Sequence, residues 1–496
     1  MKVLLMTPPY YVPSRSFAIS VGQPLGISYV GGALREAGHE VHLLDGLMGG
    51  LMRGVSPDSL TGEEEDRVRI SRGVFQRHPL NAPFPAGATI VGMSFEAIEA
   101  QIRALKPDVV GISTIFTSIY RSASHIASLV KKINPKIITI MGGTHVTVSA
   151  NEVVQEAAVD YIVTGEGEQT AVALLAALEA GKRPYAIPGV GFVSASGSVH
   201  HLDNTLNWAL DDLPMPAFDL LEMEDYFACM AEGRVAKLYT TRGCPFNCSF
   251  CSVPLTSQRR FRAHSVARVM AEIDHWVEHY RVEGLVFEDD NMNTNKKHYQ
   301  AMLSALRERG HALTVDARNL RCDLLDETIL ALMKSVGFRT VWITPETGSQ
   351  RVMDEVINKR MKVSDAKQAA RRIVASGMEV GAAFVIGFPG ETRAEIQQTI
   401  DFAYELRALG VRNFWWSIAT PIMGTALYQT ALDAGLISGI DLDSFTYNSA
   451  SYDTEHFSRQ EIEALRHQLM ETLNRDQNAA CGKPDFGRSA ITAAIG

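Results

Sequence analysis

Residues 241–251 read Thr-Arg-Gly-Cys244-Pro-Phe-Asn-Cys248-Ser-Phe-Cys251, and this stretch carries the strongest signal in the chain. Its three cysteines have the spacing CxxxCxxC. They come just after the end of an apolar run over 237–241, and no fourth cysteine follows nearby. A 4Fe–4S cluster held by three thiolates keeps one iron without a protein ligand, so a small molecule can bind there. The spacing therefore predicts that Cys244, Cys248 and Cys251 hold a cluster with one open iron.

Two other uses of this cysteine triplet are weaker. A structural zinc ion needs four ligands, commonly supplied as two close pairs, and the nearest fourth ligand would be His264 at no recognised spacing. Disulfides form in oxidising compartments, but the chain has only six cysteines. Its apolar N-terminal run is too short for a signal peptide and stops at Pro8 and Pro9. We therefore expect reduced thiols and a cytoplasmic location.

The composition is that of a globular protein and narrows the choice of partner. Of the 496 residues, 46% are hydrophobic and 21% are charged, and this length allows two or three domains. No uninterrupted apolar stretch is long enough to cross a bilayer, so we expect no membrane span. The net charge of −9, without a basic run, argues against nucleic acid as a substrate.

Residues 1–200 are predicted to form an α/β domain with a doubly wound parallel sheet. Helices are expected over 25–37, ended by Gly38, and over 122–133. Residues 46–92 interrupt the alternation with Gly, Pro and an acidic run, and we expect an inserted loop with a short helix there. The expected buried strands are 3–7, 41–45, 109–114, 137–143 and 161–165.

A second alternating series follows a linker predicted over 201–232. Six apolar runs, each followed by a helical pattern, suggest a partial (β/α)6 barrel of the TIM type at 233–430, with its chemistry at the carboxyl ends of the strands. A mainly helical C-terminal segment is expected at 431–496. The expected barrel strands are 237–241, 284–288, 313–317, 340–344, 380–386 and 413–419.

Three local patterns in this half have specific structural meanings. Ser265 is a helix N-cap, and Ser458 begins a capping box that starts a helix reaching about Asn474. Trp415 and Trp416 are neighbours on the last strand. They must face opposite ways, so we expect roles in the core or against a helix rather than contact with a substrate.

The cysteine triplet and four strand ends together resemble the radical S-adenosylmethionine (SAM) superfamily. Each strand end alone is compatible with an ordinary strand-to-helix turn, because Gly and Asp are common there, but four in order behind the triplet argue against coincidence. In that superfamily the open iron binds the amino and carboxylate groups of SAM, and an electron from the cluster cleaves SAM to a 5′-deoxyadenosyl radical. The four strand ends are Glu288-Asp289, Asp316-Ala317-Arg318, Glu346-Thr347-Gly348-Ser349 and Gly387-Phe388-Pro389-Gly390.

The resemblance implies contacts with SAM and leaves the catalytic residues unknown. Phe250, just before the third cysteine, would lie near the adenine, and Arg318 would pair with the SAM carboxylate, which suits a guanidinium fork. The implied SAM-binding residues are Phe250, Glu288, Asp289, Arg318, Glu346, Gly387, Pro389 and Gly390.

A doubly wound sheet before such a barrel resembles the cobalamin-binding radical SAM family, and the chain looks like its class B methyltransferases up to about residue 430. Ligands of such sheets bind at the carboxyl ends of the strands. The pattern D-x-H-x-x-G, by which many cobalamin domains supply a histidine to cobalt, is absent. Ligation by His145, the nearest histidine, is therefore the weaker alternative. The implied cobalamin-binding residues are Pro8, Pro9, Ser113, Thr114, Gly142, Gly143, His145, Gly165, Glu166 and Gly167.

The same resemblance implies an enzyme that methylates an unactivated carbon of a small molecule through a 5′-deoxyadenosyl radical and methylcobalamin. Its partner would be an external one-electron reductant such as flavodoxin or ferredoxin. Cyclisation, rearrangement or another group transfer are alternatives on the same scaffold. A tRNA methylthiotransferase is disfavoured, because that group carries a second cysteine triplet and here no cysteine precedes Cys229. A non-catalytic iron–sulfur or corrinoid carrier, from another class, would need no open iron.

Overall fold

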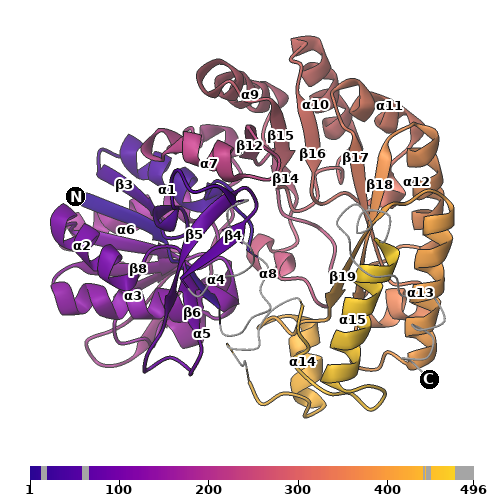
Figure 1. Cartoon of the computed structure of the whole chain (residues 1–496). Coiled ribbons are helices and arrows are strands. Elements are labelled where there is room, and N and C mark those ends of the chain that lie inside the picture. The colour runs from indigo at the N-terminus through magenta and orange to yellow at the C-terminus, as the bar shows by residue number, and fades with distance from the viewer. Residues whose placement is uncertain (13–18, 58–65, 440–441, 443–447, 475–496) are drawn as a thin grey trace. The chain divides into compact units, whose positions relative to one another are not determined.

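The computed structural model describes residues 1–12, 19–57, 66–439, 442 and 448–474 of the chain (Figure 1). The chain divides into two compact units, Met1–Val235 (unit 1) and Ala236–Gly496 (unit 2). Both units are built from alternating strands and helices, which confirms the predicted α/β class. The finer domain boundaries at 200, 232 and 430 stay predictions.

Seven strands form one sheet among the described residues of unit 1, in the order β11-β10-β9-β8-β7-β1-β3. The five strands from β9 to β3 pair in parallel, as predicted, and β10 and β11 add an antiparallel edge. The strand order reverses between β1 and β7, and ligands of such sheets bind at that switch point. The bounds are β1 (Lys2–Thr7), β3 (Glu40–Asp45), β7 (Val109–Ser113), β8 (Ile138–Gly142), β9 (Tyr161–Val163), β10 (Val190–Val193) and β11 (Val199–His201).

Helices cover both faces of this sheet because alternate strand residues point to opposite faces. Leu4 and Met6 pack into one buried cluster with α2 and α3, whereas Val3 and Leu5 pack into another with α1 and α6. The predicted helices over 25–37 and 122–133 are confirmed as α1 and α3. The bounds are α1 (Leu25–Glu36), α2 (Phe95–Leu105), α3 (Tyr120–Ile133), α4 (Thr144–Val148), α5 (Ala150–Val153), α6 (Gly167–Glu179) and α7 (Met223–Cys229).

The prediction of an inserted loop with a short helix over 46–92 is wrong for most of its described residues. Three strands of this range join the strand after β1 in an antiparallel sheet, and Met48–Gly50 forms a 3-10 turn. The missed signal is the alternation Arg67-Val68-Arg69-Ile70, which is typical of a strand, before a tight turn at left-handed Ser71. Residues 58–65 lie outside the described residues. In sheet order the strands are β2 (Tyr10–Val12), β6 (Thr89–Val91), β5 (Gly73–Pro79) and β4 (Arg67–Ile70).

Unit 2 contains the six predicted barrel strands, arranged as two three-stranded sheets in the orders β12-β15-β16 and β17-β18-β19. Val315 in β16, the last strand of the first sheet, forms a parallel bridge with Phe338, which comes just before β17, the first strand of the second sheet. All six predicted strands are confirmed within a few residues. The bounds are β12 (Val235–Leu238), β15 (Gly284–Phe287), β16 (Thr314–Ala317), β17 (Thr340–Glu346), β18 (Glu379–Ile386) and β19 (Asn413–Ile418).

Helices follow these strands and lie along one side of them (Figure 1). The Ser265 cap and the Ser458 capping box are both present. The two tryptophans face opposite ways, as expected: Trp416 is buried in the core and stacks on Phe384 with a centroid distance of 4.7 Å, whereas Trp415 is 41% exposed. The bounds are α9 (Val266–Tyr280), α10 (Lys296–Arg309), α11 (Glu327–Ser335), α12 (Val363–Ala375), α13 (Arg393–Ala408), α14 (Ala426–Asp433) and α15 (Arg459–Leu473).

An irregular connection joins β17 to α12. It contains a π-helix, Val352–Val356, and then two left-handed residues, Asn358 with φ 56° and Arg360 with φ 54°. Short π-turns are frequent at functional sites, and left-handed residues other than glycine cost about 1–3 kcal/mol each. Such a connection persists only where its surroundings fix it. No helix in the described part of the chain is long and apolar enough to span a bilayer.

Candidate functional site

The cysteine loop, residues 243–251, lies between β13 (Thr241–Arg242) and α8 (Val253–Ser257). β13 pairs antiparallel with β14 (Arg262–Ala263), which fixes the chain before and after the loop. Gly243 has φ 84°, and a Cβ atom there would lie 2.1 Å from the carbonyl oxygen of Arg260. Its N–H donates to Asp290 Oδ2 at 2.8 Å. The start of the loop is therefore fixed at a position that only glycine fits.

The three cysteine thiols lie close enough to influence one another. Burial raises the pKa of Cys248 to about 11 and that of Cys251 to about 12, and in each case the neighbouring thiols of the triplet add to the rise. Among the described residues, no three or more His, Cys, Asp or Glu side chains are placed to hold a single metal ion together. A cluster of four irons instead needs thiolates on separate irons. Three neighbouring free thiols fit that need.

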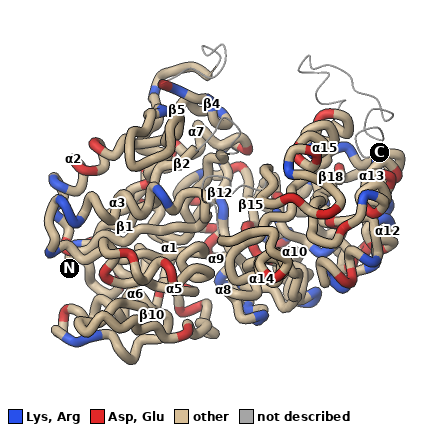
Figure 2. Tube along the Cα trace, turned by 90° about the horizontal axis from the view of Figure 1, so that it is seen from below, with Lys and Arg blue, Asp and Glu red and all other residues tan. Residues whose placement is uncertain are grey.

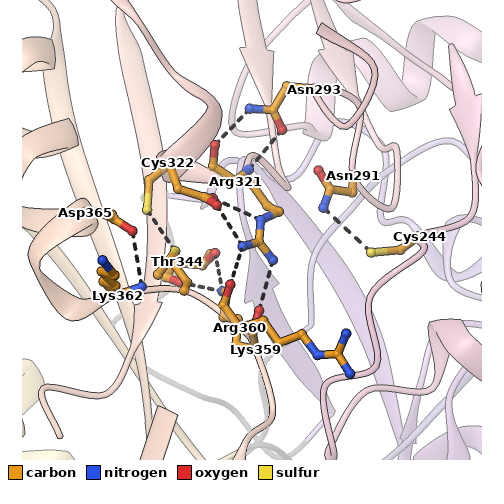
Figure 3. Close-up of polar contacts among 12 residues, drawn as sticks. Cys244, Asn291, Asn293, Arg321, Cys322, Thr344, Lys359, Arg360, Lys362 and Asp365 are labelled. Carbon is orange, nitrogen blue, oxygen red and sulfur yellow. Dashed lines mark hydrogen bonds and ion pairs between the residues drawn. The ribbon is translucent and has the colours of Figure 1, made fainter. Parts of the chain in front are cut away.

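Cations offset the burial of these thiols. Lys359 and Arg321 lower the pKa of Cys248, against the larger effect of burial. The side chain of Asn291 also reaches the loop, where Nδ2 donates to Cys244 Sγ at 3.6 Å (Figure 3). Binding a metal requires the thiolate form, so these groups favour the form that a cluster needs.

Charged side chains of both signs meet at neighbouring strand ends. Glu288 lies 3.1 Å from Lys237 Nζ and 4.0 Å from Arg318 Nε, and Arg318 lies 3.5 Å from Asp316. Glu288 and Arg318 have exposed side-chain fractions of 26% and 36%. A partly exposed cation beside a partly exposed anion suits a zwitterion with an amino and a carboxylate group.

Asp289 lies beneath this surface rather than in it. The side chain is 1% exposed, and Oδ1 accepts hydrogen bonds from the backbone N–H and the hydroxyl of both Thr240 and Thr241. Burial raises the pKa of Asp289 to about 7, against the lowering effect of these hydrogen bonds. The carboxylate thus anchors the strand that leads into the cysteine loop.

The structure brings Phe250 and the turn after β18 together. The Phe250 and Phe388 rings have a centroid distance of 5.9 Å, and Phe250 and Cys248 both pack on one buried cluster. Gly387 and Gly390 are left-handed, with φ 88° and 75°, and Phe388 and Pro389 lie between them. The cluster consists of Val352, Ile357, Val385, Phe388, Ala419 and Leu427.

Glu346, at the end of β17, is left-handed with φ 66° and is 8% exposed. Its Oε1 lies 2.6 Å from Lys359 Nζ. Sequence patterns single out Glu346 but give no sign of Lys359, which follows the π-helix. Sequence patterns also give no sign of Arg321 and Asn358, because each acts through a contact with the cysteine loop from a distant part of the chain.

The loops after β7 and β8 form the centre of a second site, in unit 1. Gly143 has φ 103°, and a Cβ atom there would lie 2.7 Å from the Thr114 carbonyl oxygen. The Thr114 hydroxyl is buried and has no hydrogen-bond partner among the described residues. Ile115 and Phe116, the next residues of the loop, are 42% and 43% exposed. This surface offers close backbone approach and an apolar patch for a ligand.

The loops after β1 and β9 flank this centre, because β1 pairs with β7 and β9 with β8. Pro8 and Pro9 are buried, and Gly46 packs on their backbone. Gly165 has φ 72°, and a Cβ there would lie 2.1 Å from Asn204 Nδ2. Glu166 Oε2 accepts a hydrogen bond from the Asn207 N–H at 3.2 Å, and Gly167 begins α6.

His145 is part of this region but points into the protein. It is 4% exposed, Nδ1 lies 3.0 Å from the Thr117 hydroxyl, and the ring packs on Tyr120 with a centroid distance of 4.6 Å. Burial lowers the pKa of His145 to about 4. The imidazole is therefore neutral and held by its neighbours.

Comparison with known proteins finds one known domain in each unit of the chain. The radical SAM superfamily domain matches residues 238–403, and the B12-binding domain matches residues 84–175. An uncharacterized methyltransferase of Pyrococcus horikoshii is 29% identical over 94% of this chain and 90% of its own. The cytidylyl-2-hydroxyethylphosphonate methyltransferase of Streptomyces wedmorensis is 26% identical over 84% and 78%. An anaerobic magnesium-protoporphyrin IX monomethyl ester cyclase of Rubrivivax gelatinosus is 27% identical over 75% and 66%.

Two solved structures share the fold. The cobalamin-dependent SAM radical enzyme OxsB, with aqua-cobalamin and SAM bound, matches with a TM-score of 0.70 over 99% of this chain and 70% of its own. The radical SAM methyltransferase TsrM of Kitasatospora setae, with cobalamin and a 4Fe–4S cluster bound, matches with a TM-score of 0.66 over 88% and 80%. Both are 16% identical to this chain, so they bear on the fold alone.

A radical SAM barrel that follows a B12-binding sheet defines one class of enzyme. The chain carries the two domains that make up such an enzyme, a B12-binding domain followed by a radical SAM domain. The two domains confirm the predicted cofactors, which are a 4Fe–4S cluster with SAM in the barrel and cobalamin in the N-terminal sheet.

Proposed function

We propose that this enzyme methylates an unactivated carbon of a small molecule. When bound, the cluster with SAM supplies a 5′-deoxyadenosyl radical and cobalamin supplies a methyl group. One observation carries the proposal: a single chain contains two sites. Unit 2 has a loop with three free thiols and the charged pair Glu288 and Arg318, and unit 1 has a glycine-lined surface where the strand order of its sheet reverses.

In unit 2 we assign cluster binding to Cys244, Cys248 and Cys251. The mixed-charge pair Glu288 and Arg318 would hold the amino and carboxylate ends of SAM. Phe250 and the turn Gly387-Phe388-Pro389-Gly390 would face its adenine, because a flat ring needs an apolar wall and close backbone approach. Asp289 would support this site indirectly, because it binds Thr240 and Thr241 before the cysteine loop. Glu346 would support it through its ion pair with Lys359.

In unit 1 we assign cobalamin binding to the loops after β1, β7, β8 and β9. The left-handed glycines allow a flat ring to approach the backbone, and Ile115 and Phe116 offer it an apolar contact. His145 would be a wall of the site and not a cobalt ligand, because Thr117 and Tyr120 hold its ring.

The reaction requires electrons from outside the chain. One substrate C–H and two SAM molecules, with two electrons, give the methylated product, S-adenosylhomocysteine, 5′-deoxyadenosine and methionine. A one-electron carrier such as flavodoxin or ferredoxin would deliver them, in the cytoplasm. Lys and Arg lie among Asp and Glu along the trace (Figure 2), which favours a small molecule over nucleic acid as the substrate.

Product analysis tests the proposal. Reconstituted, reduced enzyme with SAM, cobalamin and substrates drawn from neighbouring biosynthetic steps should form methylated product, S-adenosylhomocysteine and 5′-deoxyadenosine in a ratio near one to one to one. The similarity to a cyclase favours ring closure as a second candidate. Formation of 5′-deoxyadenosine without S-adenosylhomocysteine or methylated product would support that candidate and contradict methylation.

A further inference from the structure

The turn after β18 begins with a glycine whose conformation needs support from other groups. Gly387 and Gly390 are left-handed, and glycine has more backbone conformations open to it than other residues have. A turn built on two such residues keeps one shape only where other groups bind its backbone. Glu391 provides one part of this support, because its Oε2 accepts hydrogen bonds from the N–H groups of Gly387 and Phe388 at 2.8 and 3.1 Å.

Tyr452 binds the carbonyl group of the same glycine. The Tyr452 side chain is 4% exposed, and its hydroxyl oxygen lies 3.2 Å from the Gly387 carbonyl oxygen and 3.1 Å from the Ala419 carbonyl oxygen. One hydroxyl proton serves both acceptors. Ala419 directly follows β19, and its N–H donates to the Ile386 carbonyl oxygen at 2.9 Å. Tyr452 therefore joins the turn after β18 to the end of the neighbouring strand.

The Tyr452 hydroxyl keeps its proton and so remains a donor. Burial raises the pKa of Tyr452 above its usual range, and the negative charge of Glu391 adds to the rise. Loss of the hydroxyl would leave the Gly387 and Ala419 carbonyl oxygens without this bond in the protein interior, where an unpaired polar group is costly. The glycine turn could then adopt other backbone conformations.

The C-terminal helix α15 contacts the same glycine by packing. A Cβ atom at Gly387 would lie 3.1 Å from Ile462 Cγ1, and Ile462 is 2% exposed. The helix is fixed along β19 (Figure 1), because the Asn474 side chain accepts from the Phe414 N–H at 2.8 Å and donates to the Phe414 carbonyl oxygen at 2.9 Å. One stretch of the chain, residues 448–474, thus supplies both a hydrogen bond and a packing contact to Gly387.

We propose that Tyr452 is a positioning residue for SAM, because its hydroxyl holds the Gly387 carbonyl group and so fixes the turn that faces the adenine. The proposal rests on the assignment of Gly387-Phe388-Pro389-Gly390 to the adenine under the proposed function. A turn that already has its bound shape spares the ligand the cost of ordering it. Loss of the hydroxyl should therefore weaken the binding of the adenine end of SAM and leave the binding of its methionine end unaltered.

The test is equilibrium dialysis of SAM and of methionine against the reconstituted full chain, with the cluster oxidised so that no SAM is cleaved. Tyr452→Phe keeps the ring and removes only the hydroxyl. It should raise the dissociation constant of SAM about fivefold, which is the typical effect of one lost hydrogen bond, and leave that of methionine at its wild-type value. Ser451→Ala is the matched control, because this buried hydroxyl has no hydrogen-bond partner among the described residues. It should keep the wild-type affinity for both ligands.

The two ligands together separate a positioning role from a structural one. An unchanged affinity of Tyr452→Phe for SAM, at full iron content, would overturn the proposal. Equal weakening of SAM and methionine would also overturn it, because a general loss of structure acts on both ends of SAM. Loss of folded protein or of iron would make the hydroxyl a structural group only, with the same consequence. Wild-type protein with full iron content that binds neither ligand would instead overturn the proposed function on which the inference depends.

Discussion

At the scale of single residues, the thiols of the cysteine loop determine whether any chemistry occurs. Replacing Cys244, Cys248 and Cys251 together by Ala should abolish the visible absorbance of the cluster and all SAM cleavage, because no thiolate remains to hold iron. The measurement is iron and sulfide content with 5′-deoxyadenosine formation. Cys322→Ala is the matched control: this buried thiol contacts Met361 Sδ at 3.5 Å and belongs to no predicted ligand set. It should retain the cluster.

At the scale of elements, the turn after β18 contains a buried carboxyl group with an unusual pKa. Glu391 Oε2 accepts from the N–H groups of Gly387 and Phe388, Oε1 has no hydrogen-bond partner among the described residues, and burial raises its pKa to about 7. Between about pH 4.5 and 7 the folded state binds a proton that the unfolded state has released. The free energy of unfolding should therefore fall as pH rises through this range.

Glu391→Gln should remove that part of the pH dependence. We expect the free energy of unfolding of the wild type, relative to the variant, to fall by up to about 3 kcal/mol over this range. Tryptophan fluorescence during chemical denaturation reports mainly on unit 2, which holds Trp276, Trp342, Trp415 and Trp416. Glu379→Gln, at the exposed start of the same strand, is the control. Parallel pH profiles of wild type and Glu391→Gln would show that the carboxyl group does not titrate as described.

Elements were also what sequence patterns predicted best. Parallel strands such as β7, β8, β15 and β18 are apolar on both faces, so they form apolar runs that stand out in the sequence. The antiparallel strands β4, β5 and β6 mix polar with apolar residues and lie among Gly and Pro residues, so the sequence pattern there predicts a loop. In the candidate site, motifs next to the strands could be predicted, because their position follows from the strand end. Lys359 and Arg321 could not, because their roles depend on contacts that only the folded chain creates.

At the scale of the whole molecule, the chain should hold one corrinoid. Anaerobic purification with excess hydroxocobalamin should give a coloured protein with near-stoichiometric cobalt. In its one-electron-reduced form, the electron paramagnetic resonance spectrum should lack coupling to an axial histidine nitrogen, because His145 is held by Thr117. His145→Ala should leave that spectrum unchanged. Nitrogen coupling that disappears in His145→Ala would contradict the assignment, as would undiminished turnover by protein that retains no corrinoid.

The π-helix Val352–Val356 makes the number of residues in this connection matter as much as their identity. A π-turn accommodates one residue more than an α-turn. Deleting any one of these five residues would restore the α repeat and rotate everything after it by about 100° around the helix axis. Asn358 and Lys359 would then leave Asn247 and Glu346 at once, even with every contacting side chain unaltered. A chain of this kind can exchange many residues along the connection, but it tolerates a change of length there only if a second change restores the phase.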